Sequence, residues 1–316
     1  MSFEITLLPE GEHTVIALKD LSTGTFVEIY SFGALLNKFS VLHKGIHVNV
    51  IDGFIDVADA KQNITPYFKS AKLSPFVCRV KDAAYSFGEK VYNLTKYSAP
   101  PNAIHGLIYD ASFAVSGHQA TDTHASVRLT YLYDTEKDGF PFRYSCTVEY
   151  MLETGNALTV KTSIANASNK LMPVTDGWHP YFTLGDTIDD YQVEFQSTAV
   201  LEFDELLIPT GNTIPYEEFG SLKAFGSQKF DNCFALNFAE CQPMCVIRNP
   251  KKNIQIEFHP DKSYPYLQIY TPDSRKSIAI ENLSAAPDAF NNGIGLRVLS
   301  PNEEAIFTTK FIVKSV

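Results

Sequence analysis

In the run Ser126-Val127-Arg128-Leu129-Thr130-Tyr131-Leu132-Tyr133, apolar and polar side chains alternate almost without a break. A period of two is typical of a strand that buries one face and exposes the other. The same alternation returns over residues 144–151, 158–164 and 254–258, at places far apart in the chain. The sequence therefore predicts half-buried strands along much of its length.

Turn-forming residues separate these runs. Asp138-Gly139, Thr154-Gly155-Asn156 and Asn249-Pro250 all favour tight reversals of the chain. Helical periodicity is scarce, and residues 55–61 are expected to form at most one or two helical turns. We expect an all-β fold, a large antiparallel β-sandwich. Because no linker or internal repeat divides the chain, we expect a single domain over residues 1–316.

Composition excludes several classes of protein. The chain has 316 residues, 45% of them hydrophobic, and a formal net charge of −10, which argues against binding to nucleic acid or to an anionic membrane. Residues 1–21 carry charges throughout, so we expect no signal peptide, and no apolar run approaches the roughly 20 residues that span a bilayer. Five cysteines without a framework spacing indicate a reduced, cytoplasmic protein.

Motifs for cofactors and metals are missing from the sequence. It contains no Gly-rich phosphate loop, no dinucleotide fingerprint and no nucleophile elbow, so we expect no cofactor. Cys241 and Cys245 lack a second pair or a nearby histidine that would complete a zinc site, so we expect no metal.

One aromatic stretch, Gly177-Trp178-His179-Pro180-Tyr181-Phe182, combines groups suited to a sugar site. The indole of Trp178 offers a flat apolar face to the C–H side of a pyranose, and His179 can move protons near neutral pH. The alternative is an aromatic corner of the core that contains a hydrogen-bonded histidine.

Two more residues are candidates for acid–base chemistry. His105 lies in a loop, before a glycine that permits close approach of the backbone to a ligand; the alternative is an ordinary surface histidine. Glu281 interrupts an apolar strand, where burial would raise the pKa of its carboxyl as a general base requires. The alternative for Glu281 is a solvated strand end.

Three further side chains are candidates for holding a ligand. Arg79 follows an apolar segment of the sequence that would bury the aliphatic part of its side chain. Its guanidinium should therefore contact a carboxylate or a ligand oxygen. Asp231 is flanked by rings and can accept hydrogen bonds from hydroxyls, although an Asp-Asn turn explains it equally well. Gln268, in an alternating aromatic strand, is either a wall of a site or part of an ordinary strand.

In their residues and in their order along the chain, these segments resemble the aldose 1-epimerase, or galactose mutarotase, family. The resemblance rests on segments spread over most of the chain: Phe76-Val77-Cys78-Arg79-Val80, Asn102-Ala103-Ile104-His105-Gly106, Trp178-His179-Pro180-Tyr181-Phe182, Phe230-Asp231-Asn232-Cys233-Phe234, Tyr266-Leu267-Gln268-Ile269-Tyr270-Thr271 and Ile278-Ala279-Ile280-Glu281-Asn282-Leu283. Many members of the family have asparagine where this chain has Cys78. The resemblance implies the large β-sandwich of that superfamily, in agreement with the alternation.

The resemblance also implies roles for the candidate residues. Glu281 matches the general base, His179 the general acid and His105 a second site histidine, while Arg79 and Asp231 match positions that hold sugar hydroxyls. An isomerase of this kind interconverts the α and β anomers of a free aldohexose by opening and closing the ring. Since a protonated histidine and an ionised glutamate must coexist, we expect nearby carboxylates to raise the pKa of His179.

Other functions remain open at this point. A hexose-6-phosphate 1-epimerase would need a cluster of basic side chains for the phosphate, and only Arg79 lies among the candidate segments. A non-catalytic carbohydrate-binding protein would need neither acid nor base. A glycoside hydrolase would use two carboxylates, Glu281 and Asp231. We expect a small-molecule sugar as the partner, and a monomer or homodimer.

Overall fold

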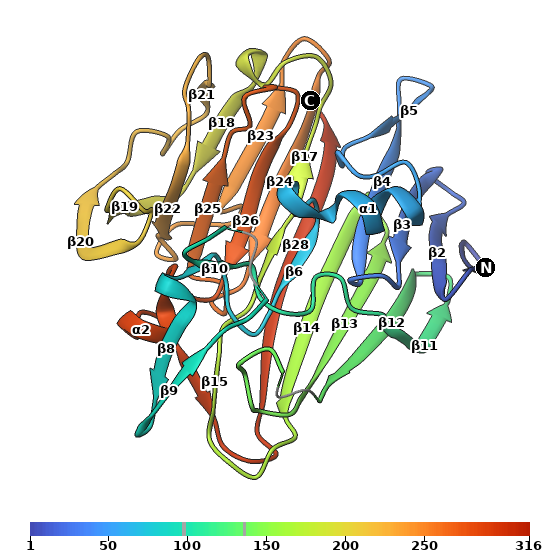
Figure 1. The fold of residues 1–316 in the computed structure, drawn as a ribbon. Helices are drawn as coiled ribbons and strands as arrows, with labels where there is room; N and C mark the ends of the chain where they lie inside the picture. Colours follow the sequence, from blue (N-terminus) through green and yellow to red (C-terminus); the bar gives the residue numbers. More distant parts are fainter. Residues whose placement is uncertain (97–98, 135–136) are drawn as a thin grey trace.

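The strands of the chain form stacked antiparallel sheets (Figure 1). The structure is a computed structural model that describes residues 1–96, 99–134 and 137–316. Within those residues the two largest sheets have nine and eight strands, and a third has five. This confirms the all-β fold and the antiparallel pairing predicted from the alternation.

The nine-stranded sheet runs across the whole molecule and contains the longest strands. In spatial order it consists of β11 (Ala114–Ala120), β12 (His124–Tyr133), β13 (Tyr144–Glu153), β14 (Ala157–Asn166), β28 (Glu304–Ser315), β24 (Ile254–Pro260), β23 (Cys245–Asn249), β18 (Gln192–Phe195) and β21 (Lys223–Ala224). The four runs with period-two alternation lie in the strands β12, β13, β14 and β24. In β24, however, residues 254–258 are all buried, so this strand is not half-buried as predicted. Gly155 and Asn156 have positive φ angles, which lets the chain reverse between β13 and β14.

The eight-stranded sheet supplies most of the residues discussed below. Its strands are β20 (Pro209–Pro215), β19 (Ser197–Phe203), β22 (Asp231–Leu236), β25 (Tyr266–Tyr270), β26 (Ile278–Leu283), β16 (Gly177–His179) and β6 (Ala71–Leu73), with β17 (Tyr181–Phe182) paired to β26. Phe182 of β17 packs edge-on against Phe258 and Phe311 of the nine-stranded sheet. These ring contacts join the two layers.

Smaller sheets and short helices complete the fold. The five-stranded sheet is β1 (Phe3–Glu10), β2 (His13–Asp20), β3 (Thr25–Tyr30), β4 (Leu35–His43) and β5 (Ile46–Asn49); the two-stranded sheets are β7 (Arg79–Val80) with β10 (Ala103–Ile104), β8 (Ala84–Phe87) with β9 (Lys90–Asn93), and β15 (Met172–Val174) with β27 (Arg297–Leu299). The helices are α1 (Val57–Tyr67), α2 (Ala289–Asn292), and the 3-10 turns Lys81–Ala83 and Ile188–Asp190. None of the helices in the described part of the chain is long and apolar enough to cross a membrane.

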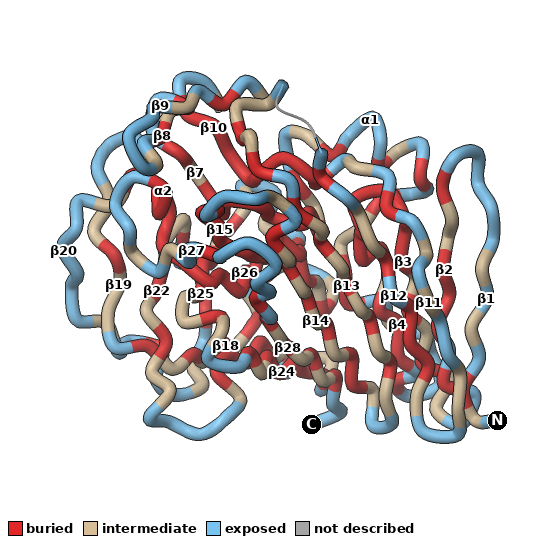
Figure 2. The backbone as a smooth tube through the Cα atoms, turned by 90° about the horizontal axis from the view of Figure 1, so that it is seen from below, coloured by how far each residue is buried: buried red, intermediate tan, exposed pale blue. Residues whose placement is uncertain are grey.

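Helix α1 is longer than the one or two turns predicted over residues 55–61. Asp56 caps its start by accepting a hydrogen bond from the Asp59 backbone, and the backbone leaves helical geometry at Thr65, just before Pro66. The helix therefore ends with Tyr67 and Phe68 beside the eight-stranded sheet. Buried residues concentrate between the layers (Figure 2), and the largest core cluster draws on all three major sheets.

Candidate active site

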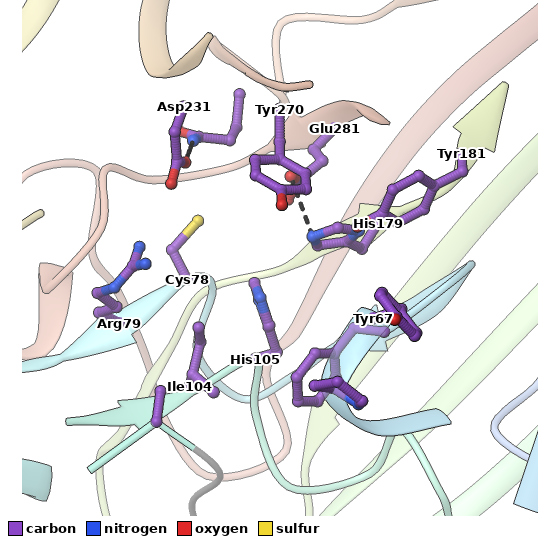
Figure 3. A pocket seen from close by; sticks show the side chains of 14 residues that line it. Tyr67, Cys78, Arg79, Ile104, His105, His179, Tyr181, Asp231, Tyr270 and Glu281 are labelled. Atoms are coloured by element: carbon purple, nitrogen blue, oxygen red, sulfur yellow. Dashed lines mark hydrogen bonds and ion pairs between the residues drawn. The ribbon is translucent and has the colours of Figure 1, made fainter. Parts of the chain in front are cut away.

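A pocket of about 330 Å³ lies against the central strands β22, β25, β26 and β16 of the eight-stranded sheet (Figure 3). This volume falls at the lower end of the range for small-molecule sites. The described residues that line it are Pro66, Tyr67, Phe68, Cys78, Arg79, Ala99, Ile104, His105, His179, Tyr181, Asp231, Gln268, Tyr270 and Glu281. Six of the seven predicted site residues are in this set, although they come from widely separated parts of the chain.

Glu281 and His179 are in direct contact in the pocket. Glu281 lies within β26 and His179 ends β16, two strands that pair beside each other. His179 Nε2 lies 3.3 Å from Glu281 Oε1, and both side chains are almost wholly buried. Pro180 after His179 keeps the histidine in extended geometry, and because proline has no backbone N–H to donate, the short strand ends there. Burial of Glu281 excludes the alternative of a solvated strand end.

His105 is a buried member of the site and not a surface histidine. It follows β10 with a φ angle of 61°, and its backbone N–H donates to the Cys78 carbonyl over 2.8 Å. Its ring packs against Phe68 at 4.6 Å and against His179 at 4.8 Å between ring centroids. The unusual backbone angle thus directs the imidazole towards the Glu281–His179 pair.

Asp231, Gln268 and Arg79 form a polar wall on the other side of the pocket. Gln268 Nε2 donates to Asp231 Oδ1 over 2.7 Å, and Gln268 lies opposite Glu281 in the register of β25 and β26. Burial raises the pKa of Asp231, and the nearby charge of Arg79 opposes that shift. The charge of Arg79 therefore lies close enough to act on this carboxylate.

Burial shifts the pKa values of Glu281 and His179, one in the predicted direction and one in the opposite direction. Burial and the charge of Asp231 raise the pKa of Glu281, while Arg79 lowers it; the prediction of a raised value is confirmed. For His179 the prediction of a raised pKa is wrong, because burial lowers the pKa to about 4. Burial also lowers the pKa of His105 well below its ordinary value, helped by His179 and Arg79.

Several buried polar atoms in the pocket have no hydrogen-bond partner among the described residues. They are His105 Nδ1, His179 Nδ1, Gln268 Oε1 and Glu281 Oε2. Buried polar atoms are normally paired, and leaving one unpaired costs about 1–3 kcal/mol. A ligand rich in hydroxyl groups would satisfy both donors and acceptors in this set.

Trp178 does not line the pocket, and its prediction as a sugar platform is wrong. Successive residues of a strand point to opposite faces, so Trp178 points away from the side on which His179 lies. Its ring packs against Tyr150 at 5.9 Å and lies beneath the Lys72 ammonium group. The indole therefore belongs to the packing behind the site.

Aromatic rings that were not among the predicted site residues surround the Glu281–His179 pair. Tyr181 stacks on His179 at 5.1 Å and meets Tyr270 edge-on, while Tyr67 and Phe68 approach from the end of α1. Tyr270 lies two positions after Gln268 in the same alternating strand, so the period-two pattern places both side chains on one face. No local pattern marks Tyr67 or Phe68, because their place depends on how α1 packs.

No group of three or more His, Cys, Asp or Glu side chains that could hold a metal ion occurs in the part of the chain that the structure describes.

Comparison with known proteins gives a consistent result. The family model described as aldose 1-epimerase matches residues 15–311. A maltose epimerase of Levilactobacillus brevis is 24% identical, with 91% of each chain covered. A galactose mutarotase of Sus scrofa is 25% identical over 84% of this chain and 77% of that protein.

Solved structures share the fold at low sequence identity. A galactose mutarotase-like protein of Clostridium acetobutylicum superposes with a TM-score of 0.88 at 20% identity, over 100% of this chain and 99% of that one. A galactose 1-epimerase of Lactobacillus acidophilus gives 0.83 at 19% identity, over 99% and 98%. The fold predicted from the resemblance is therefore confirmed.

Proposed function

Since this chain belongs to the aldose 1-epimerase family and is a sugar isomerase, we propose that it interconverts the α and β anomers of a free aldose. The observation that carries the proposal is the Glu281–His179 contact of 3.3 Å at the base of a pocket with unpaired polar atoms. A base and an acid side by side are what reversible opening of a cyclic hemiacetal requires.

The reaction moves two protons. Ring opening takes a proton from O1 and delivers one to the ring oxygen O5, which gives the open-chain aldehyde. Rotation about the C1–C2 bond then presents the other face of the aldehyde, and ring closure returns both protons. We assign the O1 proton to Glu281 and the O5 proton to His179, with the roles exchanged during closure.

One proton shared by the pair is enough for this cycle. The raised pKa of Glu281 and the lowered pKa of His179 place that proton on Glu281 when the pocket holds no sugar. The 3.3 Å contact allows it to pass to His179 as the O1 proton moves to Glu281. The pair is therefore neutral overall both before and after the transfer, which suits two side chains that are almost wholly buried.

The remaining polar residues would hold the ring in place. Asp231 and Gln268 are bonded to each other and offer further acceptors and donors to hydroxyl groups. Arg79 supplies positive charge beside them, and the neutral ring of His105 faces His179. Holding the sugar in a reactive orientation can contribute several kcal/mol to lowering the barrier.

The charge of the pocket favours an unphosphorylated sugar. Apart from the histidines, Arg79 is the one cationic side chain among the described residues that line it. A phosphate ester is usually held by several basic groups or by backbone amides. Because relatives of this chain are named for maltose and for galactose, we expect a free aldose and leave its identity to assay.

Polarimetry of freshly dissolved α-D-glucose and α-D-galactose tests the proposal. The protein should accelerate the approach to anomeric equilibrium, and Glu281→Gln or His179→Asn should each lower kcat by about 10²–10⁴-fold. Glu257→Gln is the control, because Glu257 is partly buried too but pairs with Lys314 on the nine-stranded sheet.

Three results would contradict the proposal. Unchanged rates with both sugars and with maltose, but measurable sugar binding, would indicate a carbohydrate-binding protein. Acceleration with a hexose 6-phosphate alone would indicate the phosphosugar epimerase. Release of a sugar from a glycoside would indicate a hydrolase that uses Glu281 and Asp231.

A further inference from the structure

A buried ion pair lies directly behind the candidate active site. Lys72 Nζ of β6 is 2.5 Å from Asp176 Oδ1, and neither side chain is exposed to solvent. The second carboxylate oxygen of Asp176 accepts a hydrogen bond of 2.6 Å from the Tyr264 hydroxyl, which is also buried. Neither charged residue lines the pocket, so the acid–base chemistry leaves this network without a role.

The ion pair connects the two strands that carry the catalytic residues. Lys72 donates to the Gly177 carbonyl over 3.1 Å and lies 4.3 Å from the centre of the Trp178 ring, so it holds β16 from one side. Asp176 and Ser284 exchange two hydrogen bonds of 2.8 Å, one to the Ser284 side chain and one from its backbone. Ser284 directly follows β26, so the network joins the start of β16 to the end of β26.

His179 and Glu281 each lie three residues from this junction, along strands that it connects. His179 follows Asp176 by three positions, and Glu281 precedes Ser284 by three. We propose that Lys72 and Asp176 are positioning residues, which fix β16 against β26 and so set the distance between His179 and Glu281. This inference rests on the proposed function, because it assigns the pair its catalytic meaning.

Stability alone does not account for the ion pair. Bringing two charges into a protein interior is costly, and apolar or neutral groups of similar size often serve the fold equally well or better. Breaking the pair is different, because the charge left behind has no partner. A network that costs stability and yet fixes two catalytic strands is best tested by removing both charges together.

The test compares stability with turnover in the variant Lys72→Met/Asp176→Asn. Methionine approximates the length of the lysine side chain, and asparagine still accepts the hydrogen bond from Tyr264. We expect the urea midpoint of unfolding to equal or exceed that of the wild type, KM to stay the same and kcat to fall by about 10²-fold. A kcat at the wild-type value in the folded double variant overturns the inference.

Thr25→Val is the matched control for the loss of a buried polar contact. The Thr25 hydroxyl is buried in β3 and donates to Asn156 over 2.5 Å, away from the pocket. This variant should lose stability and keep its kcat, which is the opposite of the result for the double variant. If kcat instead follows stability in both variants, the network is merely structural.

Two further measurements keep the inference testable if the double variant does not fold or if the proposed function fails. Tyr264→Phe removes one bond to Asp176, and it should lower kcat less than the double variant does while KM stays the same. The NMR resonances of the His179 ring report its contact with Glu281 without any substrate. They should shift in the folded network variants even if the wild type proves inactive on every sugar, and unchanged resonances overturn the inference.

Discussion

At the scale of single residues, the contact between Glu281 and His179 makes them titrate as one unit. The two side chains are buried and lie 3.3 Å apart, so a proton bound by one changes the affinity of the other. A carboxylic acid beside a neutral imidazole contains the same single proton as a carboxylate beside an imidazolium. Burial disfavours the charged arrangement, which explains why the sequence-based expectation for His179 was wrong.

The first prediction concerns where this proton lies. Because burial lowers the pKa of His179 to about 4, its ring should be neutral at pH 6 in the protein without sugar. The ¹⁵N chemical shifts of the imidazole distinguish neutral from protonated rings, and His179→Asn identifies the signals. Imidazolium shifts for His179 at pH 6 would show that the proton rests on the histidine instead.

The second prediction uses the two charges that act on Glu281 in opposite directions. Asp231 raises the pKa of Glu281 and Arg79 lowers it. Asp231→Asn should therefore move the alkaline limb of kcat/KM, where the pair loses its shared proton, to lower pH, and Arg79→Gln should move it to higher pH. Both variants should also lose about 10- to 100-fold in kcat/KM through missing charged hydrogen bonds. Polarimetry over a range of pH provides the measurement. An alkaline limb of kcat/KM at the same pH in the wild type and in both variants would contradict the prediction.

At the scale of elements, strand alternation explains both a success and a failure of sequence reasoning. It predicted β12, β13 and β14 of the nine-stranded sheet because each of them alternates buried with more exposed residues over much of its length. In the three-residue strand β16 every residue is buried, so no polar face shows which side carries the site. Trp178 and His179 therefore looked equivalent in the sequence, although they point to opposite faces.

The third prediction concerns the loop that carries His105. Gly106 has a φ angle of 78°, and a Cβ there would lie 2.3 Å from the Ser74 carbonyl oxygen, far inside contact distance. Gly106→Ala should therefore displace His105 and lower both stability and kcat. Gly88→Ala is the control, since Gly88 has a φ of 62° with open space around it and should lose only about 1–2 kcal/mol of unfolding free energy. Urea unfolding and polarimetry of both variants measure these effects. Equal losses of unfolding free energy and of kcat in the two variants would contradict the prediction.

At the scale of the whole molecule, the sequence predicted the architecture better than the assembly of the site. Fold class follows from local periodicity and turns, which a single chain displays directly. The pocket instead brings together residues from α1 to β26, and only the family resemblance linked Arg79, His105 and Glu281 before the structure did. The Lys72–Asp176 network carried no local signal, because it depends on the register between β6 and β16.

The fourth prediction concerns cooperativity. We propose that residues 1–316 form a single domain, because one hydrophobic cluster draws on the five-, eight- and nine-stranded sheets together. Thermal unfolding followed by far-UV circular dichroism and by tryptophan fluorescence should then give coincident transitions. The single tryptophan, Trp178, lies between the two large sheets and reports on their packing. Two separated transitions would indicate independent units.

The last prediction connects the buried histidines to stability in acid. Burial lowers the pKa of His105 and of His179, so below about pH 6.5 the unfolded chain binds protons that the folded protein does not. Each such histidine reduces the unfolding free energy by up to about 1.4 kcal/mol per pH unit as the pH falls towards its folded pKa. Glu281 acts in the opposite direction, because its raised pKa stabilises the fold at low pH and this stabilisation is lost as the pH rises through that pKa.

Between pH 6 and pH 5 the two histidines therefore lower the unfolding free energy as the pH falls, and Glu281 offsets part of that effect. His105→Asn should make the dependence of the unfolding free energy on pH less steep, while His118→Asn, at an exposed position on β11, should leave it as in the wild type. Urea unfolding at a series of pH values measures both slopes. A wild-type slope in His105→Asn would mean that His105 is protonated in the fold, which its burial against Phe68 and His179 opposes.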